Sequence, residues 1–275
     1  MNMTHNHLGM LPKLALATAT FVWATTASLS WADEEEEDEI PFDEAEIFAE
    51  LNNTDGDLGL HALIDGEGWK KLEIETARER NILKIRVKGR LKRQGLTEIF
   101  FESAEPTFDE LSPVEFFRRF PAGEYEIEGE TIEGEELESI TEFTHLMPAP
   151  PVAFVNEVPM AAVCDEEDPD YDAPEVTAPV TIAWDEVTMS HPDLGSPQGS
   201  PDIVIHNYEV VVEAEIEADG EEFTSVLSVI LPPDVTSMVI PEEFIGLSDE
   251  FKYEVLAREE SFNQTATESC FLLVE

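Results

Sequence analysis

Positive charge is scarce in this sequence. Lys and Arg number 15 against 62 Asp and Glu, and the 275-residue chain has a formal net charge of −47. A nucleic-acid-binding protein needs a basic face for the phosphates, and docking on anionic lipid needs one for the headgroups. The composition argues against both classes. Apolar residues still make up 42% of the chain, which is enough to bury a hydrophobic core.

Cysteine is also rare, and the short motifs of several enzyme classes are missing. Two cysteines are too few for a disulfide-rich scaffold or a four-thiolate zinc site. The sequence contains no His-Glu-x-x-His, no Gly-x-Ser-x-Gly and no phosphate-binding glycine loop. Carboxylate pairs are too plentiful to indicate a glycosidase. We therefore predict no catalytic residues and no cofactor other than the calcium considered below.

Acidic residues are absent from the first 32 residues, where Lys13 is the single base. The stretch Leu14–Leu29 is rich in Ala, Thr and Leu, and small residues stand at Ser30 and Ala32. This arrangement predicts a secretory signal peptide over residues 1–32. A membrane anchor is the alternative, but the apolar stretch is short and is diluted by threonine and serine. We expect a secreted or periplasmic protein with no membrane span in its mature chain.

The mature chain is predicted to hold an acidic leader and two domains. The run Asp33–Glu39 opens a solvated leader over residues 33–41, which we expect to be disordered. Residues 42–147 form the first domain. A stiff, proline-rich segment at Met147–Pro151 leads into the second domain, residues 148–275.

Short strand-like segments fill the first domain and are separated by Gly, Asp and Asn residues, as at Asp65-Gly66. Many short strands with turn signals are typical of a β-sandwich or barrel, and we predict an all-β fold with two β-sandwich-like domains. The segments expected as strands are Ala45–Leu51, Leu58–Ile64, Trp69–Glu75, Ile82–Lys88, Leu96–Glu102, Glu124–Glu130 and Ser139–His145.

One short helix is expected among these strands. Ser112 is placed as an N-cap, Pro113 stands at the first helical position and Glu115 at the third, which is a capping box with its favoured proline. Arg118 and Arg119 suit the negative end of a helix dipole, and a proline follows soon after. The pattern predicts a helix over 113–119.

Most of the bases are concentrated in the first domain. Ten of the fifteen lie between Lys70 and Arg93, and none occurs from Phe120 to Phe251. Four bases alternate along one predicted strand and share a face, as do four glutamates along another. A site for an anionic ligand is one interpretation, but abundant internal acid favours a cross-strand ladder, worth roughly 0.2–1 kcal/mol per pair. The two stripes are Lys84, Arg86, Lys88 and Arg90, and Glu124, Glu126, Glu128 and Glu130.

The second domain has a stronger β pattern. Ser190–Pro201 is rich in Pro, Gly and Ser and is predicted to be a loop. Apolar residues alternate along the segments on either side of it, which indicates half-buried strands. The expected strands are Val180–Asp185, Asn207–Ile216, Phe223–Leu231, Ser237–Ile240, Lys252–Arg258 and Ser269–Val274.

Three segments of this domain resemble a fibronectin type III domain. Thr181-Ile182-Ala183-Trp184 looks like the second strand, which carries that family's core tryptophan, and Tyr208–Val212 looks like the third. Leu247–Val255 is similar to the family's leucine, short turn and tyrosine-led strand, without the usual Pro-Gly. The resemblance covers about residues 150–275.

This resemblance implies an immunoglobulin-like β-sandwich that binds or spaces and has no catalytic residues. It places the first strand near Val152–Val163 and a loop at Glu259–Ser269, and it implies a hydrogen bond from the Tyr253 hydroxyl to nearby backbone. Large aromatics of this kind are usually buried, so we predict Trp184, Tyr208 and Tyr253 as core. A platform on which carbohydrate stacks is the alternative for the tryptophan and Tyr253.

The two cysteines are predicted to form a disulfide, because an exported protein folds in an oxidising compartment. Cys164 precedes the second strand of the fibronectin-like domain and Cys270 lies in its last strand, so the bond would clamp the two ends of that domain. Two free thiols are the alternative. A metal site shared by the pair is disfavoured because no other thiol and no histidine lies nearby in the sequence.

One turn carries alternating oxygen ligands. Asn53, Asp55 and Asp57 lie two residues apart, with glycines among them, which suits calcium. The segment departs from the helix–loop–helix calcium pattern because Leu58 stands where glycine is needed and Ile64 where the bidentate acid belongs. An ordinary Asp-Gly turn is the alternative.

These observations together predict an exported, non-enzymatic recognition or adhesion-type module that binds a protein or polysaccharide partner. A calcium- or carbohydrate-binding accessory protein is the main alternative. A secreted hydrolase whose acidic residues escape motif analysis is a third; it would need a deep cleft with converging carboxylates whose pKa values are displaced.

Overall fold

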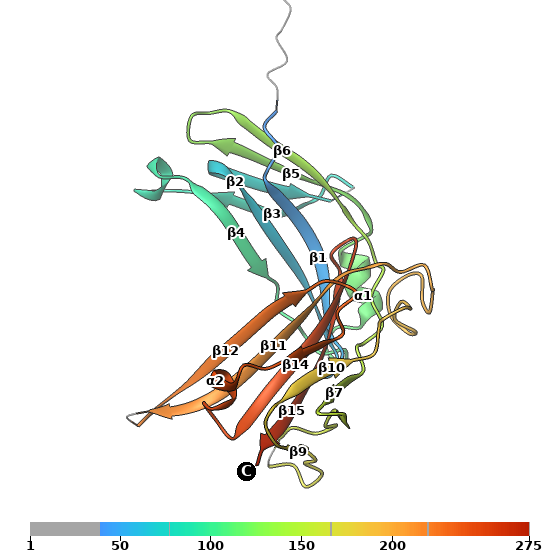
Figure 1. The fold of residues 1–275 in the computed structure, drawn as a ribbon. Helices are drawn as coiled ribbons and strands as arrows, with labels where there is room; N and C mark the ends of the chain where they lie inside the picture. Colours follow the sequence, from blue (N-terminus) through green and yellow to red (C-terminus); the bar gives the residue numbers. More distant parts are fainter. Residues whose placement is uncertain (1–38, 77, 166, 219, 275) are drawn as a thin grey trace, which may run out of the picture. The chain divides into compact units, whose positions relative to one another are not determined.

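Strands dominate the computed structural model, which describes residues 39–274 apart from 77, 166 and 219. The strands of the large sheet follow the order β12-β11-β14-β15-β1-β2-β5-β6, with β3 and β4 also paired to β2 and β9 paired to β15 (Figure 1). A small sheet has the order β13-β10-β7-β8. The all-β class is confirmed. The predicted signal peptide lies outside the described residues.

The elements are distributed along the whole described chain. Those of the first half are β1 (Glu44–Asn52), β2 (Asp57–Glu75), β3 (Asn81–Arg86), β4 (Leu96–Glu102), α1 (Pro113–Arg119), β5 (Gly123–Thr131) and β6 (Glu136–Phe143), with a 3-10 turn at Leu91–Arg93. Those of the second half are β7 (Ala153–Val155), β8 (Val158–Pro159), β9 (Glu175–Val176), β10 (Thr181–Trp184), β11 (Ile205–Ala218), β12 (Glu221–Leu231), β13 (Ser237–Val239), α2 (Glu242–Ile245), β14 (Glu250–Glu259) and β15 (Gln264–Leu273).

Helix α1 begins and ends where the sequence predicts. The Ser112 side chain accepts a hydrogen bond from the backbone N–H of Glu115 at 3.4 Å. The Glu115 carboxylate reaches forward to the Arg118 guanidinium, with Oε1 and Nη2 2.5 Å apart. Sequence analysis missed α2, which is a single short turn. Within the described part of the chain, no helix is long and apolar enough to span a membrane.

The turn predicted at Asp65-Gly66 is wrong, because β2 runs straight through it from Asp57 to Glu75. Gly66 packs closely against Phe42, where an added Cβ would lie 3.1 Å from the ring. The glycine therefore makes room for a neighbouring side chain and does not reverse the chain. The β2–β4 pairing is irregular just beyond this point, between Asp65 and Trp69.

The ladder predicted between the basic stripe and the glutamate stripe is also wrong. Strand β2 lies between β3 and β5 and pairs with both. Lys84 accordingly meets Glu73 of β2, with Nζ and Oε1 2.5 Å apart. Glu130 of β5 meets Lys70 and Lys71 of β2. Lys84 and Arg86 lie along β3 and the glutamates alternate along β5, but β2 lies between the two strands and keeps them from pairing with each other.

Two hydrophobic clusters lie along the large sheet. The first is built from residues between 42 and 147, with Trp69 and Tyr125 fully buried. Ile40, just before β1, pairs with Leu137 of β6, so the strands of the first half curl until their ends meet around this cluster. The second cluster lies between the small sheet and β11, β14 and β15, and it is built from residues between 153 and 271.

The predicted core aromatics all lie in the second cluster. Trp184 and Tyr208 pack with ring centroids 5.3 Å apart, and Tyr253 is also buried. Within the described residues, the Tyr253 hydroxyl makes no hydrogen bond to the backbone. The Tyr208 hydroxyl does make one, because it accepts from the backbone N–H of Val187 at 2.9 Å.

The last strand joins the two halves. Residues Glu50–Asn52 of β1 pair in parallel with Gln264–Ala266 of β15, and we call this pairing the seam. The loop predicted over Glu259–Ser269 is therefore wrong, because β14 extends to Glu259 and β15 begins at Gln264. The resemblance implied a loop here, yet Gln264–Ser269 belong to a strand with neighbours on both sides, and Thr265 is fully buried.

Candidate functional site

An open groove lies on the outer face of the large sheet, on the side away from the second hydrophobic cluster. Its volume is about 860 Å³. Strands β11, β14 and β15 form its floor, the segment 161–165 forms one wall, and the β1–β2 turn contributes to the rim. We call it the acidic groove, because its lining includes Asp55, Glu213, Glu215, Glu254 and Glu268.

Strand alternation places these carboxylates on one face. On β14, Phe251, Tyr253 and Val255 enter the second cluster, so Lys252 and Glu254 point the other way. Glu254 stands directly opposite Glu268 of β15 in the antiparallel register. Like charges opposite each other are unfavourable, so this pair needs a proton, a cation or a base between its members.

The groove favours the protonated form of one of its carboxyls, Glu254. Burial raises the pKa of Glu254 to about 8, and the carboxylates of Glu50, Glu268, Glu209 and Glu213 add to the rise. Burial likewise raises the pKa of Glu268. Lys252 is the one base among the described residues that line the groove. A cation that entered would be attracted to the floor and would displace the Glu254 proton.

The predicted disulfide is confirmed, and it belongs to this groove. Cys164 and Cys270 are bonded, with Cα atoms 5.8 Å apart. Cys164 lies in the wall and Cys270 in the floor. The backbone N–H of Ala161 in the same wall donates to the Ser269 hydroxyl at 2.8 Å. The bond therefore holds the wall of the groove against β15.

The structure separates the three residues of the predicted calcium turn. Asn53 turns toward His191, with Oδ1 and Nε2 3.3 Å apart. Asp55 lines the acidic groove, and its charge raises the pKa of Asp57. Asn52, which the oxygen pattern did not single out, shapes the turn, because its Oδ1 accepts from the backbone N–H groups of Thr54 and Asp55.

Asp57 is the most unusual group in this turn. One carboxylate oxygen, Oδ1, is buried without a hydrogen-bond partner. Burial raises the pKa of Asp57 to about 6, and the charges of Glu105, Asp55 and Glu268 contribute. Among the described residues, no set of three or more His, Cys, Asp or Glu side chains is arranged to hold a metal ion.

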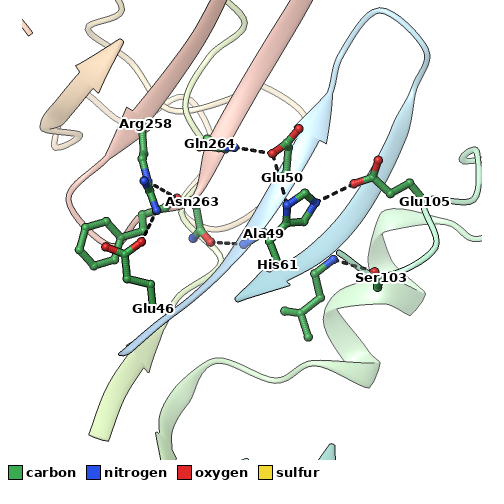
Figure 2. Close-up of polar contacts among 11 residues, drawn as sticks. Glu46, Ala49, Glu50, His61, Ser103, Glu105, Arg258, Asn263 and Gln264 are labelled. Carbon is green, nitrogen blue, oxygen red and sulfur yellow. Dashed lines mark hydrogen bonds and ion pairs between the residues drawn. The ribbon is translucent and has the colours of Figure 1, made fainter. Parts of the chain in front are cut away.

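A buried histidine between two carboxylates lies beside the seam (Figure 2). His61 Nε2 is 2.9 Å from Glu105 Oε1, and Nδ1 is 3.6 Å from Glu50 Oε2. Gln264 of β15 donates to the same Glu50 carboxylate. Burial lowers the pKa of His61, but the hydrogen bond to Glu105 and the charge of Glu50 outweigh it, so the pKa lies above its usual value.

Sequence analysis missed this cluster. The partners of His61 come from β1 and from the loop after β4, Gln264 of β15 binds one of those partners, and no local pattern links these residues. The one sequence signal is Gly59, a glycine within a strand, because a side chain there would occupy the place of the Glu105 carboxylate. Each ring nitrogen of His61 faces a carboxylate, and the hydrogen bond from Gln264 to Glu50 joins this cluster to the second half.

A second set of polar contacts crosses the seam (Figure 2). Asn263 is fully buried, accepts from the backbone N–H of Ala49 at 2.7 Å, and donates to the carbonyl of Leu146 at 3.0 Å. The Arg258 guanidinium lies 2.5 Å from Glu46 Oε2. These contacts fix the floor of the acidic groove relative to β1.

No family model matches the chain, and no curated protein matches it. Among solved structures, the chain is similar to part of a 1.5-MDa bacterial ice-binding adhesin, with 10% identity, a TM-score of 0.21, and coverage of 85% of this chain and 65% of that chain.

Two further solved structures are similar at the same level. The BSP domain of a biofilm associated protein has 12% identity and a TM-score of 0.23, over 84% of this chain and 29% of that one. A DUF3823 family protein from Parabacteroides merdae has 10% identity and a TM-score of 0.22, over 84% of this chain and 99% of that one. The similarity by itself assigns no ligand to this chain.

Proposed function

We propose that this protein is an exported, non-enzymatic recognition module of the adhesion type whose acidic groove binds a basic segment of a partner protein. The observation that carries the proposal is the groove itself, an open channel floored by carboxylates that face one another. Lysine or arginine side chains lying along β11, β14 and β15 would neutralise these carboxylates. A polysaccharide is the less favoured partner, because a neutral sugar chain leaves the facing carboxylates uncompensated.

The fold supports a second part of the proposal, that residues of about 150–275 form a fibronectin type III-like domain. The small sheet presents β13-β10-β7 against β12-β11-β14-β15 of the large sheet, with one core between them. Trp184 lies on β10, the strand after β7 in the small sheet, which fits the family's second strand. Tyr253 lies on β14, which fits the family's tyrosine-led strand. The missing backbone hydrogen bond from the Tyr253 hydroxyl is the departure from that pattern.

Export is the third part of the proposal. The disulfide between Cys164 and Cys270 is typical of an oxidising compartment, secreted or periplasmic. Mass spectrometry of the exported form tests the signal peptide, because the mature chain should begin at Asp33. A peptide that still contained Lys13 would contradict it.

The binding proposal is tested with a synthetic peptide in which lysine alternates with alanine. Calorimetry should show binding to the oxidised protein, weaker at high salt, and about tenfold weaker after Glu213→Gln with Glu215→Gln. The control, Glu124→Gln with Glu142→Gln, removes the same charge from β5 and β6. If the two double variants lose affinity equally, the peptide responds to net charge, and the groove is not its site.

A calcium-binding accessory function is the second candidate, and the buried, unpartnered oxygen of Asp57 favours it. Calcium should raise the melting temperature more than equal magnesium, which demands stricter geometry. Asp55→Asn with Asp57→Asn should erase that difference, and Asp168→Asn with Asp170→Asn should keep it. An equal response to both ions in every variant would mean diffuse screening.

A further inference from the structure

The edge strands of the large sheet differ in how well they are protected from pairing with another strand. Strand β12 is an edge strand of 11 residues, and no strand in the described part of the chain pairs with its far side. Its segment Thr224–Leu231 carries no charge, although the chain as a whole has 62 acidic residues. Val226 and Ile230 are exposed, at 56% and 63%. Both stand opposite glutamates of β11, so they share the outer face.

The other edges carry the protection that β12 lacks. Strand β6 bears Glu136, Glu138 and Glu142, and Ile40 covers part of its edge by pairing with Leu137. Strand β3 carries two bases and β4 two glutamates, while β13 and β8 have three residues and two. Charged, short or covered edges prevent strand addition, whereas a long uncharged edge invites it.

We propose that β12 is a dimerisation edge, which pairs antiparallel with β12 of a second copy of this chain. The strand is complementary to itself. With the two-fold axis at Ser228, Val226 of one copy stands opposite Ile230 of the other, and Leu227 stands opposite Val229. The two most exposed apolar side chains of the strand then cover each other. No like charges meet in the ladder over Thr224–Leu231, although the rest of each copy is strongly acidic.

The charge of the remaining surface gives this dimer a characteristic salt dependence. Two copies with a formal charge of −47 each repel one another, and salt screens that repulsion over about 10 Å at 0.1 M. Salt does not weaken the β12–β12 contact itself, because Thr224–Leu231 has no charged side chains. Association should therefore strengthen as sodium chloride rises, opposite to an interface built on ion pairs.

The test uses a matched pair of lysine substitutions in the full exported chain. Ile230 on β12 and Ile140 on β6 are equally exposed, at 63% and 61%. Sedimentation equilibrium should show a wild-type dimer at moderate salt, at least tenfold weaker association for Ile230→Lys, and an unchanged dimer for Ile140→Lys. A wild-type chain that stays monomeric at every salt concentration overturns the proposal, as does equal loss in both variants.

A cross-link tests the register. In an antiparallel pair, opposite Cα atoms lie within the range that a disulfide needs, so Ser228→Cys at the two-fold axis should form a covalent dimer on oxidation. Thr224→Cys, which would stand opposite Pro232, should not. Equal cross-linking at both positions would indicate random collision. Circular dichroism melts confirm that each variant is folded.

Discussion

Two glutamates, one in each half of the chain, lie in opposite surroundings. In the first half, Glu73 lies 2.5 Å from Lys84, and the hydrogen bond from that lysine lowers the pKa of the glutamate. In the second half, Glu254 stands opposite Glu268, and burial and neighbouring carboxylates raise the pKa of Glu254 to about 8. The first arrangement favours the charged form, and the second favours the neutral one.

The difference follows from where the bases lie in the sequence. No Lys or Arg occurs from Phe120 to Phe251, so β11 and β12 bring only acidic charge to the sheet. In the first half, bases of β2 and β3 pair with Glu130 and Glu73, although burial and neighbouring carboxylates raise the pKa of Glu128 on β5. In the second half, Lys252 is the one base among the described residues that line the acidic groove. The binding proposal depends on this excess of carboxylates over bases. Each prediction below tests whether these two kinds of surroundings behave as differently as the structure implies.

The largest expected effect comes from the disulfide, which belongs to the second half alone. Replacing Cys164 and Cys270 by alanine opens a loop whose ends are 106 residues apart. The chain-entropy model gives about 5 kcal/mol for such a loop, and urea unfolding measures it. Binding of the lysine peptide should weaken as well, because the groove wall loses its tether. An unchanged urea midpoint would contradict this prediction.

The next effect concerns the seam that joins the halves. Asn263→Ala removes the acceptor for the Ala49 N–H and the donor for the Leu146 carbonyl, and both groups are left without this partner. Unsatisfied buried groups cost about 1–3 kcal/mol each, so the free energy of unfolding should fall by about 3 kcal/mol. The control, Asn81→Ala, removes exposed hydrogen bonds and should change it by less than about 0.5 kcal/mol. Equal losses would show that the seam is not special.

Local sequence signals predicted local structure well. The cap at Ser112 fixes where α1 begins, because it acts within one helical turn. The pairing of Cys164 with Cys270 also follows from composition, since two cysteines in an oxidising compartment have one possible partner each. Alternation correctly placed the bases of β3 on one face. Each of these inferences needed only the residues of one segment, or a pair with no competitor.

The same reasoning could not predict which strands pair when they are far apart in the sequence. The parallel pairing of β1 with β15 joins residues more than 200 positions apart, and nothing in either strand specifies the other. The hydrogen bond from Gln264 of β15 to the Glu50 carboxylate beside His61 depends on this pairing and was missed with it. The charge ladder failed for the same reason, since alternation shows which face a lysine occupies and leaves its neighbouring strand undetermined.

Glu254→Gln should stabilise the protein at neutral and alkaline pH. The folded carboxyl has a pKa of about 8, above the ordinary value of 4.5, so the folded state binds more protons than the unfolded state between these values. Wild-type stability therefore falls as pH rises from about 4.5 through about 8. The glutamine variant removes this dependence and should gain about 2 kcal/mol at pH 9, measured by urea unfolding. A variant that is less stable than wild type at pH 9 would contradict the raised pKa.

The smallest expected effect has the opposite sign to that of Glu254→Gln. Glu73→Gln should destabilise the protein at neutral pH, because the pKa of Glu73 is lowered by the hydrogen bond from Lys84. The stability that a lowered pKa contributes is present above about pH 4.5 and is lost as pH falls through the folded value. Glu73 is well solvated, so the loss should stay below about 1 kcal/mol and should shrink in high salt. Paired urea titrations of Glu73→Gln and Glu254→Gln at neutral pH should therefore move in opposite directions. If both substitutions stabilise the chain, repulsion among all its carboxylates governs both halves, and the local partners of each glutamate do not decide its contribution.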